Sequence, residues 1–125
     1  MPEETSKKTV LLVDDDPNVH LLFSTVIQGM GYEVVGEARD GKEGLQMFQE
    51  KAPDLVLLDI HMPVMDGIEA LKKILAADPN ARVVMLTTLH NMDIYEECLL
   101  LGAKRYIPKD TPMMELRNRI SEAIE

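Results

Sequence analysis

The sequence predicts an α/β fold in which five strands and five helices alternate around one parallel sheet. Five short runs rich in β-branched and aliphatic residues have the length of strands, and segments with a helical apolar period lie between them. The first, third and fourth runs are almost continuously apolar, as strands covered by helices on both faces are. Strands and helices that alternate at this spacing favour a single (βα)5 domain, and a chain of 125 residues has room for one.

The expected strands cover residues 9–13, 33–36, 54–58, 82–86 and 104–107. Residues 9–125 form the predicted domain, and residues 1–8 form a short polar N-terminal extension. Apolar side chains three and four residues apart predict the helices between the strands. In chain order these side chains are Val19, Leu22, Phe23, Val26, Ile27 and Met30; Leu45 and Phe48; Ile68, Leu71, Ile74 and Leu75; Ile94, Cys98 and Leu101; Leu116, Ile120 and Ile124.

Residues that favour helix ends flank these stripes. The pairs Asp16-Pro17 and Thr111-Pro112 each place a capping side chain before a proline at the first helical position. The remaining signals are two capping boxes that begin at Asp40 and Asp66 and two helix-ending glycines, Gly31 and Gly102.

Composition excludes several classes of function. The chain has 13 basic and 22 acidic residues, and its net charge of −9 repels the phosphate backbone of nucleic acids. No apolar run approaches the length of a membrane span, about 18 residues, and the N-terminus lacks the apolar core of a signal peptide. One cysteine, Cys98, cannot form an internal disulfide, which suits a reducing compartment. We therefore expect a cytoplasmic protein that does not itself bind nucleic acid or membranes.

Polar side chains follow the expected strands at their carboxyl ends, the edge at which open α/β sheets bind ligands. Asp14 and Asp15 follow the first strand, Asp59 follows the third, Thr87 follows the fourth and Lys109 comes after the fifth. These positions lie one or two strand–helix units apart, so we expect their side chains to meet. Clustered carboxylates repel one another unless a cation offsets their charge, and Mg²⁺ prefers oxygen ligands of this kind. The set suggests phosphoryl transfer to an aspartate.

One tract is more specific than any single acidic residue, namely Asp59-x-x-Met62-Pro63-x-Met65-Asp66-Gly67. Together with Val13-Asp14-Asp15-Asp16, Met85-Leu86-Thr87-Thr88 and Lys109, it resembles the receiver domain of two-component response regulators, of the chemotaxis-regulator type. The resemblance covers the chain from the first strand to the fifth helix. It implies a flavodoxin-like fold with strand order 2-1-3-4-5 and helices on both faces of the sheet.

The resemblance implies a role for each site residue. Asp59 would accept a phosphoryl group from the phosphohistidine of a sensor kinase or a phosphotransfer protein. Thr87 would hydrogen-bond one phosphoryl oxygen, and Lys109 would pair with another. Tyr106 matches an aromatic position whose ring turns inward when the threonine moves toward the phosphate. The chain would then be a phosphoacceptor regulator that catalyses its own phosphorylation and dephosphorylation, and not an enzyme acting on a separate substrate.

The same resemblance implies a Mg²⁺ site, with Mn²⁺ as a substitute. Asp15 and Asp59 would bind the ion through their side chains, His61 through its backbone carbonyl and Asp14 through a water. The three histidine side chains do not have the spacing of metal ligands. We expect His20, His61 and His90 to be ordinary surface or helix residues.

The sequence departs from the family pattern after the lysine. Most receivers have a proline there, joined by a cis peptide bond, whereas Lys109 is followed by Asp110. A cis bond between these residues would cost about 2.5–4 kcal/mol, so we expect a trans bond. In the family, the residue two positions after the threonine shapes the approach of the hydrolytic water. Here it is Leu89, which cannot hydrogen-bond a water, so we expect a comparatively long-lived phosphoryl group. The residue two positions after the acceptor, His61, also shapes this approach, and orientation of the water by His61 is the alternative.

The expected output face consists of the fourth helix, the fifth strand and the fifth helix. Tyr95 and Leu99 stand four residues apart and form a second apolar stripe that points outward, with Tyr106 beside it. Such a stripe docks a partner or a second copy of the chain. Scattered surface leucines without a function are the alternative.

Two other functions remain to be weighed against a phosphorylation switch. A protein-interaction module that kept the fold and lost phosphorylation is disfavoured by the intact set of site residues. An aspartate-nucleophile phosphatase usually carries a second catalytic aspartate two residues beyond the nucleophile, where this chain has His61. The cognate kinase, the output and the existence of an output domain after Glu125 are left open by the sequence.

Overall fold

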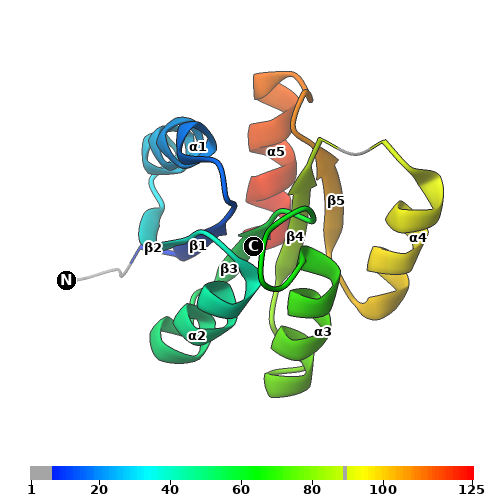
Figure 1. Ribbon diagram of the computed structural model, residues 1–125. Helices are drawn as coiled ribbons and strands as arrows, with labels where there is room; N and C mark the ends of the chain where they lie inside the picture. Colours follow the sequence, from blue (N-terminus) through cyan, green and yellow to red (C-terminus); the bar gives the residue numbers. More distant parts are fainter. Residues whose placement is uncertain (1–6, 89) are drawn as a thin grey trace.

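The order of strands and helices agrees with the prediction from the sequence (Figure 1). The computed structural model describes residues 7–88 and 90–125. Its elements are β1 (Thr9–Val13), α1 (Pro17–Gly29), β2 (Glu33–Ala38), α2 (Gly41–Lys51), β3 (Leu55–Leu58), α3 (Gly67–Ala77), β4 (Val83–Thr87), α4 (Met92–Leu101), β5 (Arg105–Pro108) and α5 (Met113–Ile124). The strands form one parallel sheet in the order β2-β1-β3-β4-β5. The predicted α/β class and the 2-1-3-4-5 order are both confirmed.

Helices cover both faces of the sheet (Figure 1). The helices α1 and α5 pack on one face, and α2, α3 and α4 pack on the other. Side chains alternate along β1, so that Leu11 and Val13 join the core under α2 and α3, whereas Val10 and Leu12 join the core under α1 and α5. This burial on both faces explains the continuous apolar runs in the sequence. None of the helices within the described residues has the length and apolar character of a membrane span.

The strand β2 is longer than predicted. The expected strand ended at Gly36, but pairing with β1 continues to Ala38. A Cβ atom on Gly36 would lie 3.0 Å from side-chain atoms of Leu11 and Met47, so glycine lets neighbouring side chains close over the strand without ending it. The other strand boundaries agree with the prediction to within one residue.

The predicted helix caps are correct at three of four positions. A side-chain oxygen accepts a hydrogen bond from the first helical turn at Asp16, Asp40 and Asp66. The expected cap at Thr111 is wrong, because α5 begins at Met113 and Pro112 precedes it with an extended backbone (φ −53°, ψ 142°). The N–H of Thr111 donates to the carbonyl of Pro108 at 3.1 Å, so Thr111 belongs to the turn after β5.

Three helices are followed by residues in the left-handed region, and one of these residues is an alanine. Gly31 (φ 91°) and Gly102 (φ 118°) follow α1 and α4, as the sequence predicted. Ala52 ends α2 with φ 46° and ψ 57°, and its N–H donates to the carbonyl of Phe48. A side chain with a Cβ is strained in this conformation, so Ala52 stores a small amount of backbone strain.

We predict that Ala52→Gly raises the free energy of unfolding by about 0.5–1 kcal/mol, because glycine has no Cβ to strain at this exposed position. Thermal unfolding of the two proteins measures the change. The matched control is Ala76→Gly at an exposed position inside α3, which should lower the free energy of unfolding by about 1 kcal/mol. A loss of stability at both positions would contradict the strain at Ala52.

Candidate functional site

Backbone pairing between strands fixes the site residues relative to one another. The N–H of Asp59 donates to the carbonyl of Val13 at 2.9 Å, and the N–H of Lys109 donates to the carbonyl of Thr87 at 2.8 Å. These bonds continue the parallel sheet just past the ends of β3 and β5. The carboxyl edge of the sheet therefore brings the predicted phosphoacceptor, hydroxyl and lysine together.

Lys109 lies between two buried carboxylates. Its Nζ atom is 2.6 Å from Oδ2 of Asp14 and 3.5 Å from Oδ2 of Asp59. Asp14 is 4% exposed and Asp59 is 7% exposed, whereas Lys109 is only partly buried. The shorter contact is with Asp14, a preference that the sequence did not predict. The positive charge of the lysine is thus shared by two carboxylates.

The acidic side chains fit a divalent cation. One oxygen from each of Asp14, Asp15 and Asp59 lies within 4.8 Å of the other two. Asp15 is exposed, so the cluster is open on that side. Three carboxylates outweigh the single charge of Lys109, and hard oxygen donors of this kind suit Mg²⁺. The geometry gives Mn²⁺ no separate support, and the backbone carbonyl of His61 stays a predicted ligand.

The carboxyl group of Asp59 is held in an unfavourable environment for its charge. Burial raises the pKa of Asp59 above its ordinary value of 3.8, and the neighbouring Asp14 raises the pKa further. The charge of Lys109 and hydrogen bonds from Ile60 and Thr87 lower the pKa in part. The N–H of Ile60 donates to Oδ1 at 2.8 Å. A carboxylate in such a site is more basic and therefore a better nucleophile than one in water.

Tyr106 is buried in the structure, in the core under α3 and α4. Its ring centroid lies 5.4 Å from that of Tyr95, at an interplanar angle of 65°. Burial raises the pKa of Tyr106, and Cys98 and Asp59 raise it further. Tyr106 thus lies beside exposed Tyr95, as expected, and its own side chain is buried. Its rotation during switching stays a prediction.

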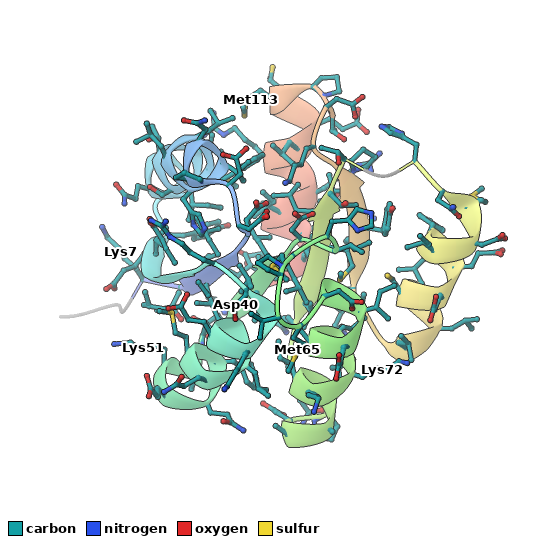
Figure 2. All side chains as sticks on the ribbon, in the orientation of Figure 1. Lys7, Asp40, Lys51, Met65, Lys72 and Met113 are labelled. Carbon is teal, nitrogen blue, oxygen red and sulfur yellow. The ribbon has the colours of Figure 1, made fainter. Side chains whose placement is uncertain are left out.

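The loop between β3 and α3 begins at the predicted phosphoacceptor, Asp59. Where this loop ends, at Gly67, there is no space for a side chain. A Cβ atom on Gly67 would lie 1.9 Å from the backbone oxygen of Asp59. Earlier in the loop, the carbonyl of Met65 accepts a hydrogen bond of 3.0 Å from the N–H of Gly41. Figure 2 labels Met65 and Asp40 where the loop passes the start of α2. Gly67 therefore does more than form a turn, because it lets α3 begin against the acceptor itself.

The sequence interpretation missed His20. This residue is 4% exposed, and its Nε2 atom lies 2.6 Å from the backbone oxygen of Asp14. We expected an ordinary surface or helix residue. The signal was present, because His20, Phe23 and Ile27 stand at helical spacing and all three are buried. Leu22, which the predicted stripe included, is exposed.

Three further positions were singled out in the sequence, namely Cys98, the peptide bond after Lys109, and Leu89. Cys98 is buried, and burial raises the pKa of its thiol to about 11, so little reactive thiolate forms at neutral pH. The described residues contain no cis peptide bond, so the bond between Lys109 and Asp110 is trans, as predicted. Leu89 lies outside the described residues, and its effect on the lifetime of the phosphoryl group stays a prediction.

The fold and this edge of the sheet define a receiver of the two-component type. The family model of the response regulator receiver domain matches residues 10–121, and the chain belongs to that family. Receiver domains are phosphoacceptor regulators in two-component signalling. The resemblance inferred from the sequence is therefore confirmed.

The chain is similar to chemotaxis regulators among other receivers. The chain is 36% identical to chemotaxis protein CheY of Thermotoga maritima, over 92% of this chain and 98% of the relative. It is 41% identical to chemotaxis protein CheY of Treponema pallidum, over 93% of this chain and 82% of the relative. A chain in the crystal structure of the CheX-CheY-BeF3-Mg+2 complex from Borrelia burgdorferi matches with a TM-score of 0.90 and 32% identity, covering 94% of this chain and 90% of that one.

We predict that Asp59→Asn stabilises the protein at neutral pH when a chelator removes divalent cations. The raised pKa means that folding penalises ionised Asp59, and the penalty is complete above the pKa of the folded state. The gain should therefore shrink as the pH falls through that pKa and vanish below 3.8, where Asp59 is protonated in both states. Melting temperatures measured across this pH range provide the test.

The control for this prediction is Asp54→Asn, at the opposite end of the same strand. Asp54 is exposed, and its side chain accepts hydrogen bonds from Thr9, so neutralising it should give no gain at neutral pH. If Asp59→Asn melts at or below the wild-type temperature at neutral pH, the electrostatic account of the acceptor is wrong.

Proposed function

We propose that the protein is a phosphorylation-dependent switch in which Asp59 accepts a phosphoryl group from the phosphohistidine of a sensor kinase or a phosphotransfer protein. The observation that carries the proposal is a buried carboxylate that lies 3.5 Å from Lys109 and close to two further carboxylates. Membership of the receiver family supports the same function. The proposal places the protein in the cytoplasm together with its phosphodonor.

The acceptor needs no general base, because an ionised carboxylate is already a nucleophile. The N–H of Ile60 donates a hydrogen bond to Oδ1 of Asp59, and Oδ2 of Asp59 contacts Nζ of Lys109. We propose that Oδ2 forms the new bond to phosphorus while the bond from phosphorus to the donor imidazole nitrogen breaks. The electron pair of that bond stays on the nitrogen, which leaves a neutral histidine on the donor once its proton is balanced with solvent.

The proposed ligands of Mg²⁺ are the carboxylates of Asp15 and Asp59, the backbone carbonyl of His61 and, through a water, Asp14. An indirect role suits Asp14 because both of its carboxylate oxygens are engaged. Oδ2 contacts Lys109, and Oδ1 accepts a hydrogen bond of 2.9 Å from the N–H of Asp16. Bound Mg²⁺ would supply positive charge to the phosphoryl oxygens. The Borrelia burgdorferi structure is that of a complex with BeF3 and Mg²⁺, which supports such a site in a receiver of this fold.

Lys109 and Thr87 would respond to the new group. A phosphoryl group on Asp59 brings additional negative charge within reach of the ammonium of Lys109, which would then loosen its contact with Asp14. The Thr87 hydroxyl is fully buried beside Asp59 and can donate a hydrogen bond to a phosphoryl oxygen. Thr87 ends β4 and Lys109 follows β5, so each lies at the start of the segment that leads to α4 or to α5, and we propose that their movement is transmitted along these segments.

We propose that the response is read on the face formed by α4, β5 and α5. Met92 and Tyr95 are exposed on α4, and Tyr95 contacts the buried ring of Tyr106. Leu99, which the sequence placed in the outward stripe, is half-buried, whereas Leu100 is exposed. A movement of Tyr106 would change the position of Tyr95 and hence the shape of this face. Its occupant would be an output partner or a second copy of the chain.

Phosphorylation itself is the first test. We expect that incubation with acetyl phosphate and Mg²⁺ adds one phosphoryl group to the intact protein, measured by mass spectrometry, and that Asp59→Asn abolishes the gain. Asp54→Asn is the matched control and should be phosphorylated normally. If the wild-type protein gains nothing from acetyl phosphate or from a phosphohistidine donor, the chain is an interaction module with the receiver fold, and the proposal fails.

A second prediction concerns the cation. We expect Mg²⁺ to raise the melting temperature of the wild-type protein, because it binds the folded state only. Asp15→Asn should remove most of this increase, and it should not lower the melting temperature in a chelator because it removes one of three crowded charges. An Asp15→Asn protein that still responds to millimolar Mg²⁺ as the wild type does would show that the ligand set is wrong.

The output face yields a third prediction. Tyr95→Asp should weaken any self-association or partner binding that phosphorylation strengthens, because it puts a charge into an apolar contact surface. Leu21→Asp on α1 is the control, since Leu21 is also exposed but lies on a helix that packs on the face of the sheet opposite α4. Sedimentation of the phosphorylated proteins measures the effect. Equal association of Tyr95→Asp and the wild type, with normal phosphorylation of Asp59, would exclude this face.

A further inference from the structure

His20 is the one histidine that α1 buries, and it lies against the loop that carries the acidic cluster. Its Nε2 atom is 2.6 Å from the backbone oxygen of Asp14. A carbonyl oxygen only accepts hydrogen bonds, so Nε2 carries a hydrogen and donates it. This contact joins the first turn of α1 to the residue that follows β1.

The bond to His20 completes the restraint on Asp14. The N–H of Asp14 donates to the carbonyl of Ala38 at 3.0 Å, which continues the pairing of β1 with β2. Its carboxylate contacts Lys109 and the N–H of Asp16. The backbone oxygen, bound by His20, belongs to the peptide group that joins Asp14 to Asp15. The orientation of this peptide group sets the direction in which Asp15 leaves the loop.

A histidine at position 20 is less favourable for the stability of the fold than an apolar residue would be. The Nδ1 atom of His20 is buried and, among the described residues, has no hydrogen-bond partner; the nearest carboxylate oxygen of Glu37 is 3.9 Å away. An unpaired buried polar atom is unfavourable, and an apolar side chain would avoid it, as Phe23 and Ile27 do on the same face of α1. The gain that offsets this cost is the hydrogen bond from Nε2 to Asp14.

We propose that His20 is a positioning residue for the cation site, and that its hydrogen bond to the Asp14 carbonyl holds Asp15 where it can bind the ion. This inference rests on the proposed function, because it presumes that Asp15 is a ligand. Without the bond, the peptide group between Asp14 and Asp15 would be free to rotate, and the site would have to be ordered when the ion binds. Loss of such an outer contact typically weakens metal binding by about 10- to 100-fold.

The test measures Mg²⁺ affinity directly by calorimetric titration of the full chain after treatment with a chelator. We expect His20→Leu, which keeps an apolar side chain of similar length but cannot donate, to raise the Mg²⁺ dissociation constant about tenfold. His20→Gln can place an amide N–H near the position of Nε2 and should return the constant close to the wild-type value. The side chain of His20→Asn is polar but too short to reach the carbonyl of Asp14. We expect this variant to raise the Mg²⁺ dissociation constant as His20→Leu does, and it replaces His20→Leu in the test if that variant does not fold.

Two further measurements separate positioning from general destabilisation. Ile27→Val removes a buried methyl group from the same helix and should lower the melting temperature without changing the Mg²⁺ constant. In phosphorylation by acetyl phosphate, His20→Leu should need more Mg²⁺ for half-maximal rate but reach a rate close to the wild type at saturating Mg²⁺. A purely structural defect would lower the rate at every Mg²⁺ concentration.

The inference is overturned if His20→Leu and the wild type bind Mg²⁺ equally, or if His20→Gln weakens binding as much as His20→Leu does. Equal binding with normal phosphorylation would remove the role of His20 and leave the proposed function intact. A wild-type protein that binds no Mg²⁺ would contradict the cation site itself, and the inference with it.

Discussion

The chemistry of the site depends on the burial of two carboxylates, Asp14 and Asp59, beside a single lysine. Buried charges are unfavourable unless they are paired, and Lys109 contacts both groups but can neutralise only one. Asp15 adds a third negative charge at the open side of the cluster. Burial and, after it, the charge of Asp14 raise the pKa of Asp59, and the excess negative charge makes the site favourable for a divalent cation. Nucleophilicity, cation binding and sensitivity to a new phosphoryl group therefore share one physical origin.

The scaffold keeps these charges together because it leaves the loops little room to relax. The strands β1 and β3 are buried on both faces, and each is followed at once by an acidic residue whose backbone is hydrogen-bonded to the neighbouring strand. Gly67 lets α3 start against the backbone of Asp59, and His20 binds the backbone oxygen of Asp14. The repulsion is thus opposed by a packed core on each side of the sheet. We therefore expect the site to respond to a change of charge through movements of side chains such as Lys109.

The fold and the residues of the site could be predicted from the sequence alone. Apolar runs of strand length mark where each strand ends, and parallel strands present their carboxyl ends at the same edge, so Asp59, Thr87 and Lys109 could be placed together before any distance was known. Features that depend on three-dimensional distance could not be predicted. The preference of Lys109 for Asp14 and the absence of space at Gly67 are of this kind. The burial of His20 was predictable in principle from its helical spacing to Phe23.

The central claim is that Asp14 and Asp59 share one lysine and therefore disturb each other electrostatically. The most direct measurement is a pH titration of the side-chain carboxyl carbon of Asp59 by NMR, in the absence of divalent cations. The account predicts a pKa above the ordinary 3.8 in the wild-type protein and a lower pKa in Asp14→Asn, where one carboxylate is neutral and the lysine is left to Asp59. A wild-type pKa at or below 3.8, or a pKa that does not change in Asp14→Asn, would contradict it.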